Sequence, residues 1–312
     1  MKYSQERMSD PAVQINKIGE DLKRSKRNEW GNSVEELIRA HSPYPITYDV
    51  NCLQGRNFTE YSYTELVGGM LIKTQSADIN TRLIHFCAGQ KSSVDVLDQW
   101  ESIIADKYDL NSDLPDLYSD IEDIVFLPGD NLSDLINRDN LHRLLHENPK
   151  AMIKPHPISN DAHMMSLYRD YGANRIIPAH LSGLKLLKNA KRIFTSSASE
   201  LGIVATILGK EIYNIGMFRY EAIGTYYMIT RVLFLAEDKR QALANIVNCV
   251  WSGCIFPWQD NIEERIGSYY QSTLEMKDEF KALNGPIIVP ESLKKHTQIR
   301  AEMMAKKEKE GK

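Results

Sequence analysis

Short apolar runs alternate with amphipathic segments between residues 119 and 220. The apolar runs read "DIVFLPG", "AMIKPHP", "NRIIPA", "KRIFTSS" and "EIYNIG". The segments that separate them have helical spacing, as in "DAHMMSLYRDYG" and "SELGIVATILGK". This alternation predicts right-handed βαβ units in one parallel sheet of at least four strands, with helices on both faces.

The pattern before residue 119 is less regular. Residues 41–65 are rich in Pro, Tyr, Asn and Thr, which predicts loops and short strands that line a cleft. The run "TRLIHFCAG" predicts a buried strand that ends at Gly89. The next stretch, "SSVDVLDQWESIIADKY", predicts a helix capped by Ser92 or Ser93.

The expected fold class is therefore α/β, with a Rossmann-type parallel-sheet domain, a smaller N-terminal α/β domain and C-terminal helices. The expected parts are a helical, basic N-terminal segment (1–40), the N-terminal α/β domain (41–118), the Rossmann-like domain (119–230), C-terminal helices (231–290) and a charged tail (291–312).

Composition narrows the class of protein. The chain has 312 residues, of which 42% are hydrophobic and 26% charged, and its formal charge of −4 gives no global basic signature for nucleic acid. Its four cysteines form no CxxC pair, so we expect them to be reduced and mostly structural. No apolar run approaches the roughly 18 residues that span a bilayer, and we expect a cytoplasmic protein without a membrane span.

Polar side chains gather where the apolar runs end. In open α/β sheets, ligands bind outside the carboxyl ends of the strands. Here those ends supply a cation, an imidazole, several hydroxyls and a glycine: Lys154, His156, Thr195, Ser196, Ser197, Ser199 and Gly216. Together with the start of the helix near Ser199, this set favours a phosphate or a diphosphate. Each motif alone also fits a plain turn or a helix cap.

The stretch "IKPHP", followed by "TSSASELGIVATILGKEIYNIG", resembles the nucleotide-binding half of bacterial GT-B type glycosyltransferases that carry an HP motif and a serine motif. Capsular-polysaccharide Kdo transferases and bacterial sialyltransferases belong to this group. The resemblance implies a nucleotide-sugar donor and no other cofactor or metal. It implies that His156 is the HP histidine and that Ser196, Ser197 and Ser199 hold the donor phosphate, with Glu200 in the same turn.

The resemblance also implies an acidic residue in the N-terminal part that activates the acceptor hydroxyl. No Asp-Asp-Gly motif occurs there, and Asp49, Glu60, Asp95 and Asp130 are the candidates. We favour Asp49 because neighbouring tyrosines, Tyr44 and Tyr48, predict a surface on which a sugar can stack. Three further residues are expected in the donor and acceptor cleft: Tyr220, Tyr226 and Asp130.

The sequence leaves alternatives open for the acceptor and for the reaction. A saccharide is the acceptor that the resemblance implies, and a hydroxylated base in DNA is the second possibility, because basic residues lie at 23–27 and in the tail. A sugar-nucleotide 2-epimerase and a non-catalytic nucleotide- or nucleic-acid-binding protein are the rival classes. His142 and His146 have metal-ligand spacing, but Arg143 replaces the glutamate of an HExxH motif, and we expect no metal.

Overall fold

A computed structural model describes residues 28–48, 60–74, 76–107, 118, 120–129, 136–157, 159–216 and 227–284. The chain divides into two compact units, Met1–Gln271 and Ser272–Lys312. The described part of the second unit is the end of helix α12 (Ile262–Asn284). Everything else described below belongs to the first unit.

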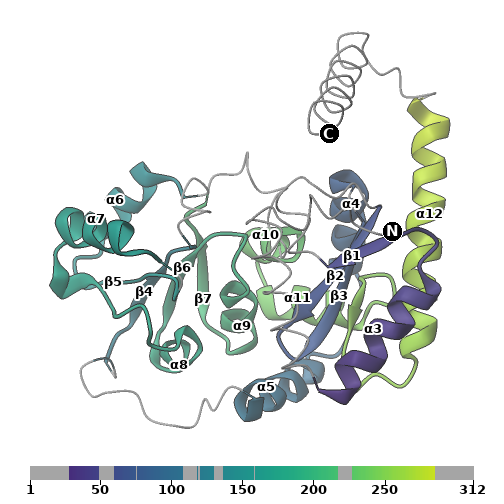
Figure 1. Ribbon diagram of the computed structural model, residues 1–312, viewed down its shortest axis with the longest axis horizontal. Helices are drawn as coiled ribbons and strands as arrows, with labels where there is room; N and C mark the ends of the chain where they lie inside the picture. Colours follow the sequence, from purple (N-terminus) through teal and green to yellow (C-terminus); the bar gives the residue numbers. More distant parts are fainter. Residues whose placement is uncertain are drawn as a thin grey trace, which may run out of the picture. The chain divides into compact units, whose positions relative to one another are not determined.

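Four parallel strands form one sheet, as the alternating pattern predicts. They are β4 (Asp123–Phe126), β5 (Met152–Lys154), β6 (Arg192–Thr195) and β7 (Glu211–Asn214). Their spatial order is β5-β4-β6-β7, and every pair is parallel (Figure 1). The prediction of a parallel sheet with at least four strands is confirmed.

Helices cover both faces of this sheet, because successive strand residues point to opposite sides. On one face, Ile124 and Ile193 pack with α8 (Gly183–Asn189) and α9 (Leu201–Ile207). On the other face, Val125 and Phe194 pack with helices that follow β4 and β5. These helices are α6 (Arg138–Glu147) and α7 (Asp161–Tyr171).

A second, mixed sheet holds the N-terminal part. Its strands are β1 (Ile46–Tyr48), β2 (Tyr61–Leu66), β3 (Gly69–Thr74) and β8 (Cys254–Ile255). The order is β1-β2-β3-β8; β1 and β2 are parallel, and the other pairs are antiparallel. Helix α3 (Glu29–His41) packs against β3.

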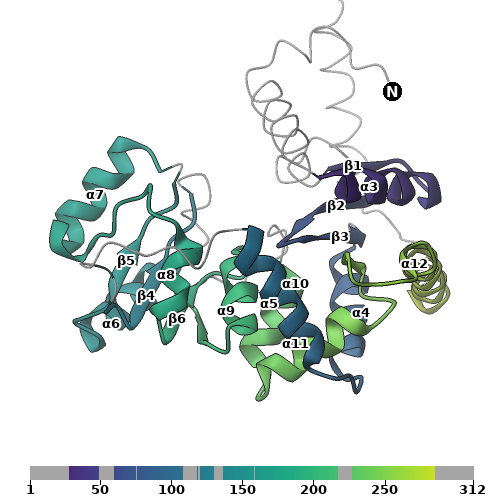
Figure 2. The same cartoon turned by 90° about the horizontal axis from the view of Figure 1, so that it is seen from below.

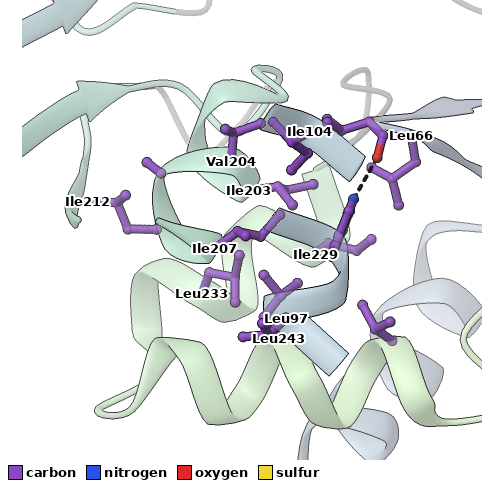
Figure 3. Packing of buried hydrophobic residues seen from close by; sticks show 14 of the residues in the cluster. Leu66, Leu97, Ile104, Ile203, Val204, Ile207, Ile212, Ile229, Leu233 and Leu243 are labelled. Carbon is purple, nitrogen blue, oxygen red and sulfur yellow. Dashed lines mark hydrogen bonds between the residues drawn. The ribbon is translucent and has the colours of Figure 1, made fainter. Parts of the chain in front are cut away.

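One hydrophobic core includes residues of both sheets. Helices α4, α5, α9, α10 and α11 pack against one another around it, and Figure 2 shows α4 beside α10 and α11. Four of these five helices have not been described above: α4 (Ala77–Ala88), α5 (Asp95–Lys107), α10 (Tyr227–Leu235) and α11 (Lys239–Asn248). Figure 3 shows side chains of α5, α9, α10 and α11 in one cluster, with Leu66 of β2 at its edge. The core therefore contains residues from both sides of the expected boundaries at 118 and 230, and the five-part division stays a prediction.

Two expected strands are wrong. The run "TRLIHFCAG" belongs to helix α4, whose buried residues Ile79, Leu83, Ile84 and Cys87 recur with helical spacing. Periodicity alone cannot separate a short buried strand from part of a buried helix, and the Ser76 cap lies five residues before this run. The run "NRIIPA" makes only one parallel bridge, between β5 and Ile176, because a short 3₁₀ turn, η4 (Ala173–Arg175), precedes it and a proline follows.

The helix after Ser92 and Ser93 is confirmed as α5, and the Ser93 hydroxyl accepts a hydrogen bond from the Asp95 N–H (3.2 Å). Helix α6 begins at Arg138, after the Asn137 cap, and Ile136 just before it bridges to Gly216.

Candidate functional site

Two of the predicted phosphate-binding residues, Lys154 and Thr195, lie at the same height along their strands, at the carboxyl edge of the parallel sheet. Lys154 of β5 lies opposite Phe126 of β4. Phe126 follows Val125, the last residue of β4 that pairs with β6, and is therefore level with Thr195 of β6. Thr195 in turn lies opposite Asn214 of β7. Since neighbouring strands lie about 4.8 Å apart, Lys154 and Thr195 are separated by about two spacings, or about 10 Å.

Lys154 is buried, with 2% of its surface exposed. Its Nζ donates hydrogen bonds to the carbonyl oxygens of Pro155 (2.7 Å) and Ala179 (2.9 Å), which tie the end of β5 to the loop before α8. An ammonium group has three N–H donors, so these bonds leave one for a ligand. Burial lowers the pKa of Lys154 to about 8, because a low-dielectric environment disfavours the charged form.

His156 lies one residue beyond the buried Pro155, and its side chain is exposed to solvent. Its carbonyl oxygen accepts a hydrogen bond from the Ser159 N–H (3.0 Å), which closes a turn directly after the strand. The imidazole therefore extends from a fixed backbone and is accessible from outside.

Two hydroxyl groups at the end of β6 are buried without partners. Thr195 is 0% exposed and Ser196 is 2% exposed. Neither Thr195 Oγ1 nor Ser196 Oγ has a hydrogen-bond partner among the described residues. Burial of a hydroxyl without a hydrogen bond costs about 1 to 3 kcal/mol, so such groups point to a missing water, ion or ligand. Ser197 is also buried, and its carbonyl oxygen accepts a hydrogen bond from the Thr230 hydroxyl of α10 (2.6 Å).

The turn from β6 into α9 is already closed by its own hydrogen bonds. The Ser199 N–H donates to the Ser196 carbonyl (3.1 Å), and the Ser199 hydroxyl accepts from the Leu201 N–H (3.3 Å). Glu200 occupies the N-cap position of α9, and its Oε1 accepts a hydrogen bond from the Val67 N–H (2.6 Å) in the turn between β2 and β3. Its carboxylate brings a negative charge to the place where the sequence predicts a bound phosphate.

At the end of β7, Asn214 was missed by the sequence prediction. Its Oδ1 accepts a hydrogen bond from the Gly216 N–H (2.8 Å), whereas its Nδ2 has no partner among the described residues. Gly216 is buried and bridges to Ile136. The strand-end rule that selected Thr195 would also have selected Asn214, because the two residues pair directly.

A pocket of about 330 Å³ lies on the face of the parallel sheet that α6 covers, between α6 and the strands β6 and β7. Its lining includes Arg143, Glu147, Tyr213 and Asn214, and none of the residues predicted for the site. The predicted residues of the parallel sheet therefore share an edge without sharing this pocket.

The acceptor-side residues are only partly described. The expected base Asp49, the alternative Asp130, and the cleft residues Tyr220 and Tyr226 lie outside the described residues. The other candidate bases, Glu60 and Asp95, are exposed.

The expected sugar-stacking surface of tyrosines is wrong for Tyr48. This residue is 1% exposed and its hydroxyl donates to Glu65, so the ring is part of the core. The expectation failed because Tyr in a loop-rich stretch can equally fill a sheet face.

The described residues contain no group of three or more His, Cys, Asp or Glu side chains that could hold a metal ion. Within the same residues, no helix is long and apolar enough to span a bilayer. No family model, curated protein or solved structure matches the chain.

Proposed function

We propose that the chain is a glycosyltransferase of GT-B type that transfers a sugar from a nucleotide-sugar donor to an acceptor hydroxyl. The observation that carries this proposal is a pair of buried hydroxyls, Thr195 Oγ1 and Ser196 Oγ, that have no partner among the described residues and lie at the carboxyl end of an inner strand of a parallel sheet. Parallel α/β sheets bind their ligands at this edge, and phosphate oxygens accept hydrogen bonds from hydroxyl groups.

The neighbouring strand end supplies positive charge to the same ligand. One N–H of the Lys154 ammonium is left for a phosphate oxygen, and the exposed His156 imidazole can donate to another. A separation of about 10 Å between Lys154 and Thr195 suits a ligand with more than one anionic group, such as a diphosphate.

In the proposed reaction the acceptor oxygen attacks the anomeric carbon of the donor sugar. The bond between that carbon and the donor phosphate oxygen breaks, and its electron pair leaves with the phosphate. Lys154 and His156 stabilise the charge that develops on this oxygen. The acceptor proton passes to a carboxylate, for which Asp49 remains the proposed residue.

The acceptor is proposed to be a saccharide hydroxyl, and a hydroxylated base in DNA is the alternative outcome. The basic residues 23–27 and the lysine-rich tail, on which a DNA contact would depend, lie outside the described residues. Product analysis with both kinds of acceptor distinguishes the two.

The test begins with the melting temperature of the protein in the presence of CMP, CDP, UDP and GDP compounds and their sugar conjugates. A ligand that binds only the folded state raises this temperature. Donor consumption is then followed with and without acceptor. Release of free nucleotide diphosphate without an acceptor would identify a 2-epimerase instead, and binding without turnover would identify a non-catalytic protein.

The pH dependence of binding tests the site itself. Because the pKa of Lys154 is about 8 in the free protein, its positive charge is largely present at pH 7.5 and largely lost at pH 9.5. Affinity for a nucleoside diphosphate should therefore fall roughly 10-fold between these pH values. The Lys154→Met variant should bind weakly at both. If the affinity of the wild type for a nucleoside diphosphate is the same at pH 7.5 and pH 9.5, the phosphate binds away from Lys154.

A further inference from the structure

Three cysteines lie near the buried Arg265, at the end of α4, at the end of α11 and at the start of β8. Cys87 lies in the last turn of α4, Cys249 caps the end of α11, and Cys254 begins β8. Cys87 and Cys254 are buried, whereas Cys249 is partly exposed, and none of the three forms a disulfide. All three belong to the unit Met1–Gln271.

Close contacts hold the end of α4 against the turn after α11. The Asn245 Nδ2 donates to the carbonyl oxygen of Ala88 (2.8 Å), and the rings of Phe86 and Trp251 lie 5.2 Å apart. Cys87 directly precedes Ala88, and the Cys249 N–H donates to the Asn245 carbonyl oxygen (3.0 Å), so both cysteines lie next to this Asn245 contact. The chain therefore brings together two thiols that are far apart in sequence, one accessible and one enclosed.

Arg265 supplies a positive charge to this cluster. It is only 5% exposed, and its guanidinium donates to the carbonyl oxygens of Val247 (2.8 Å), Cys249 (3.0 Å) and Asn248 (3.2 Å). Its Nε has no hydrogen-bond partner among the described residues. A buried cation with an unused donor beside a thiol stabilises the thiolate form.

The three sulfur atoms differ in acidity. A hydrogen bond from the Cys87 thiol, the Trp251 N–H and the charge of Arg265 lower the pKa of Cys249 to about 7. The same hydrogen bond and burial raise the pKa of Cys87 far above its usual value. Burial raises the pKa of Cys254 to about 11. Cys249 is also the only one of these three thiols that is partly exposed, so a peroxide in solution reaches it first, and it is the nucleophile of the cluster.

We propose that Cys249 and Cys87 form a redox-responsive pair, in which a hydroperoxide oxidises Cys249 and Cys87 then closes a disulfide between α4 and the end of α11. In the first step the Cys249 thiolate attacks the peroxide, the O–O bond breaks, and Cys249 becomes a sulfenic acid while the peroxide leaves as hydroxide or alkoxide. In the second step the Cys87 sulfur attacks the sulfenic sulfur, and the thiol proton leaves with the hydroxyl as water.

The local structure allows this step. A disulfide requires the two sulfurs to approach to about 2.05 Å. Cys249 is followed by a turn that includes Gly253, whose φ of +75° marks a non-helical backbone, so the movement falls on a turn and leaves both helices intact. The bond would close a loop that contains the whole parallel sheet, which should make the oxidised chain harder to unfold.

The test treats the full-length chain with hydrogen peroxide and maps its cysteine peptides by mass spectrometry without reduction. The expected product is a Cys87–Cys249 cross-linked peptide that disappears on reduction, with a higher melting temperature for the oxidised chain. The same mapping in a Cys52→Ser background removes the one cysteine outside the described residues.

Two variants in that background distinguish this pair from general oxidation. Cys254→Ser is the matched control and should still form the cross-link. Cys249→Ser should form none, and because Cys249 is partly exposed the change should leave folding intact. A cross-link that involves Cys254, a Cys249 that is oxidised only to sulfinic acid in the wild type, or three thiols that all stay reduced would overturn the proposal.

Discussion

The two sheets of the molecule treat their buried polar groups in opposite ways. In the mixed sheet, the Tyr63 hydroxyl donates to Glu35 (2.6 Å) and accepts from Arg39 (2.5 Å). The Thr74 N–H at the end of β3 donates to the Tyr269 hydroxyl (2.8 Å). At the carboxyl edge of the parallel sheet, Thr195 Oγ1 and Ser196 Oγ are buried and have no partner in the described part of the chain.

The amino edge of the parallel sheet resembles the mixed sheet in this respect. There the Arg192 guanidinium donates to Asp123 (2.7 Å) and to Asn148 (2.9 Å). Among the described residues, the buried hydroxyls without a partner are those of Ser159, Thr195 and Ser196, in the segments at the carboxyl ends of β5 and β6, whereas buried N–H groups without a partner also occur at Trp30 and Trp258. If the proposed function holds, the hydroxyls at the carboxyl edge serve a ligand at some cost in stability, whereas the polar groups of the mixed sheet stabilise the fold.

The largest effect on stability is expected from the mixed sheet. Tyr63→Ala should lower the free energy of unfolding by about 3 to 5 kcal/mol, because it removes a fully buried ring, and Tyr63→Phe should lower it by about 1 kcal/mol through the lost hydroxyl. Denaturant unfolding measures both. The folded fraction of either variant should bind nucleotides as the wild type does, and a selective loss of binding would contradict the division between the sheets.

A substitution at the carboxyl edge should cost a comparable free energy in the transition state for donor turnover. His156→Ala should slow donor turnover by roughly 30- to 1000-fold, since it removes a charge-assisted hydrogen bond worth about 2 to 4 kcal/mol in the transition state. Its melting temperature should stay close to that of the wild type, because the side chain is exposed. Full turnover would refute the role of His156, and an unfolded variant would show that the histidine is structural.

Lys154 should make stability depend on pH. Its pKa is about 8 when folded and near 10.5 in the unfolded chain, so the unfolded state binds more protons between these values and stability rises with pH. Relative to Lys154→Met, the wild type should gain about 2 to 3 kcal/mol between pH 7.5 and pH 10.5. If the free energy of unfolding of the two proteins changes with pH in the same way, burial does not lower the pKa of the Lys154 ammonium.

The smallest effect is expected at the contact that joins the two regions. Glu200→Gln keeps an acceptor for the Val67 N–H and removes the negative charge next to the serine turn. Nucleoside diphosphate affinity should rise about two- to five-fold, or about 0.5 to 1 kcal/mol, with little change in stability. Isothermal titration measures this change. A weaker affinity would mean that Glu200 itself contacts the ligand.

The sequence predicted the parallel sheet well, because four short apolar runs separated by helices permit few other arrangements. It could not predict the pairing of β8 with β3, since a two-residue strand has no period and its partner lies far away in the chain. It placed Lys154, His156 and the serines at one edge but could not predict which of these side chains are buried. The structure places the Lys154 ammonium against the Ala179 carbonyl, and the Thr195 and Ser196 hydroxyls have no partner among the described residues. The sequence could not predict the Lys154 contact, because it depends on how the loop before α8 returns to the sheet.

The central claim is tested most directly by the Thr195→Val variant. Valine has nearly the shape of threonine and lacks the hydroxyl, so the substitution removes one buried group without a partner. The free energy of unfolding of the ligand-free protein should stay the same or rise by about 1 kcal/mol, while the rise in melting temperature caused by a saturating nucleoside diphosphate should shrink. A variant that is less stable without ligand and responds to the nucleotide like the wild type would show that the Thr195 hydroxyl serves the fold, and would contradict the claim.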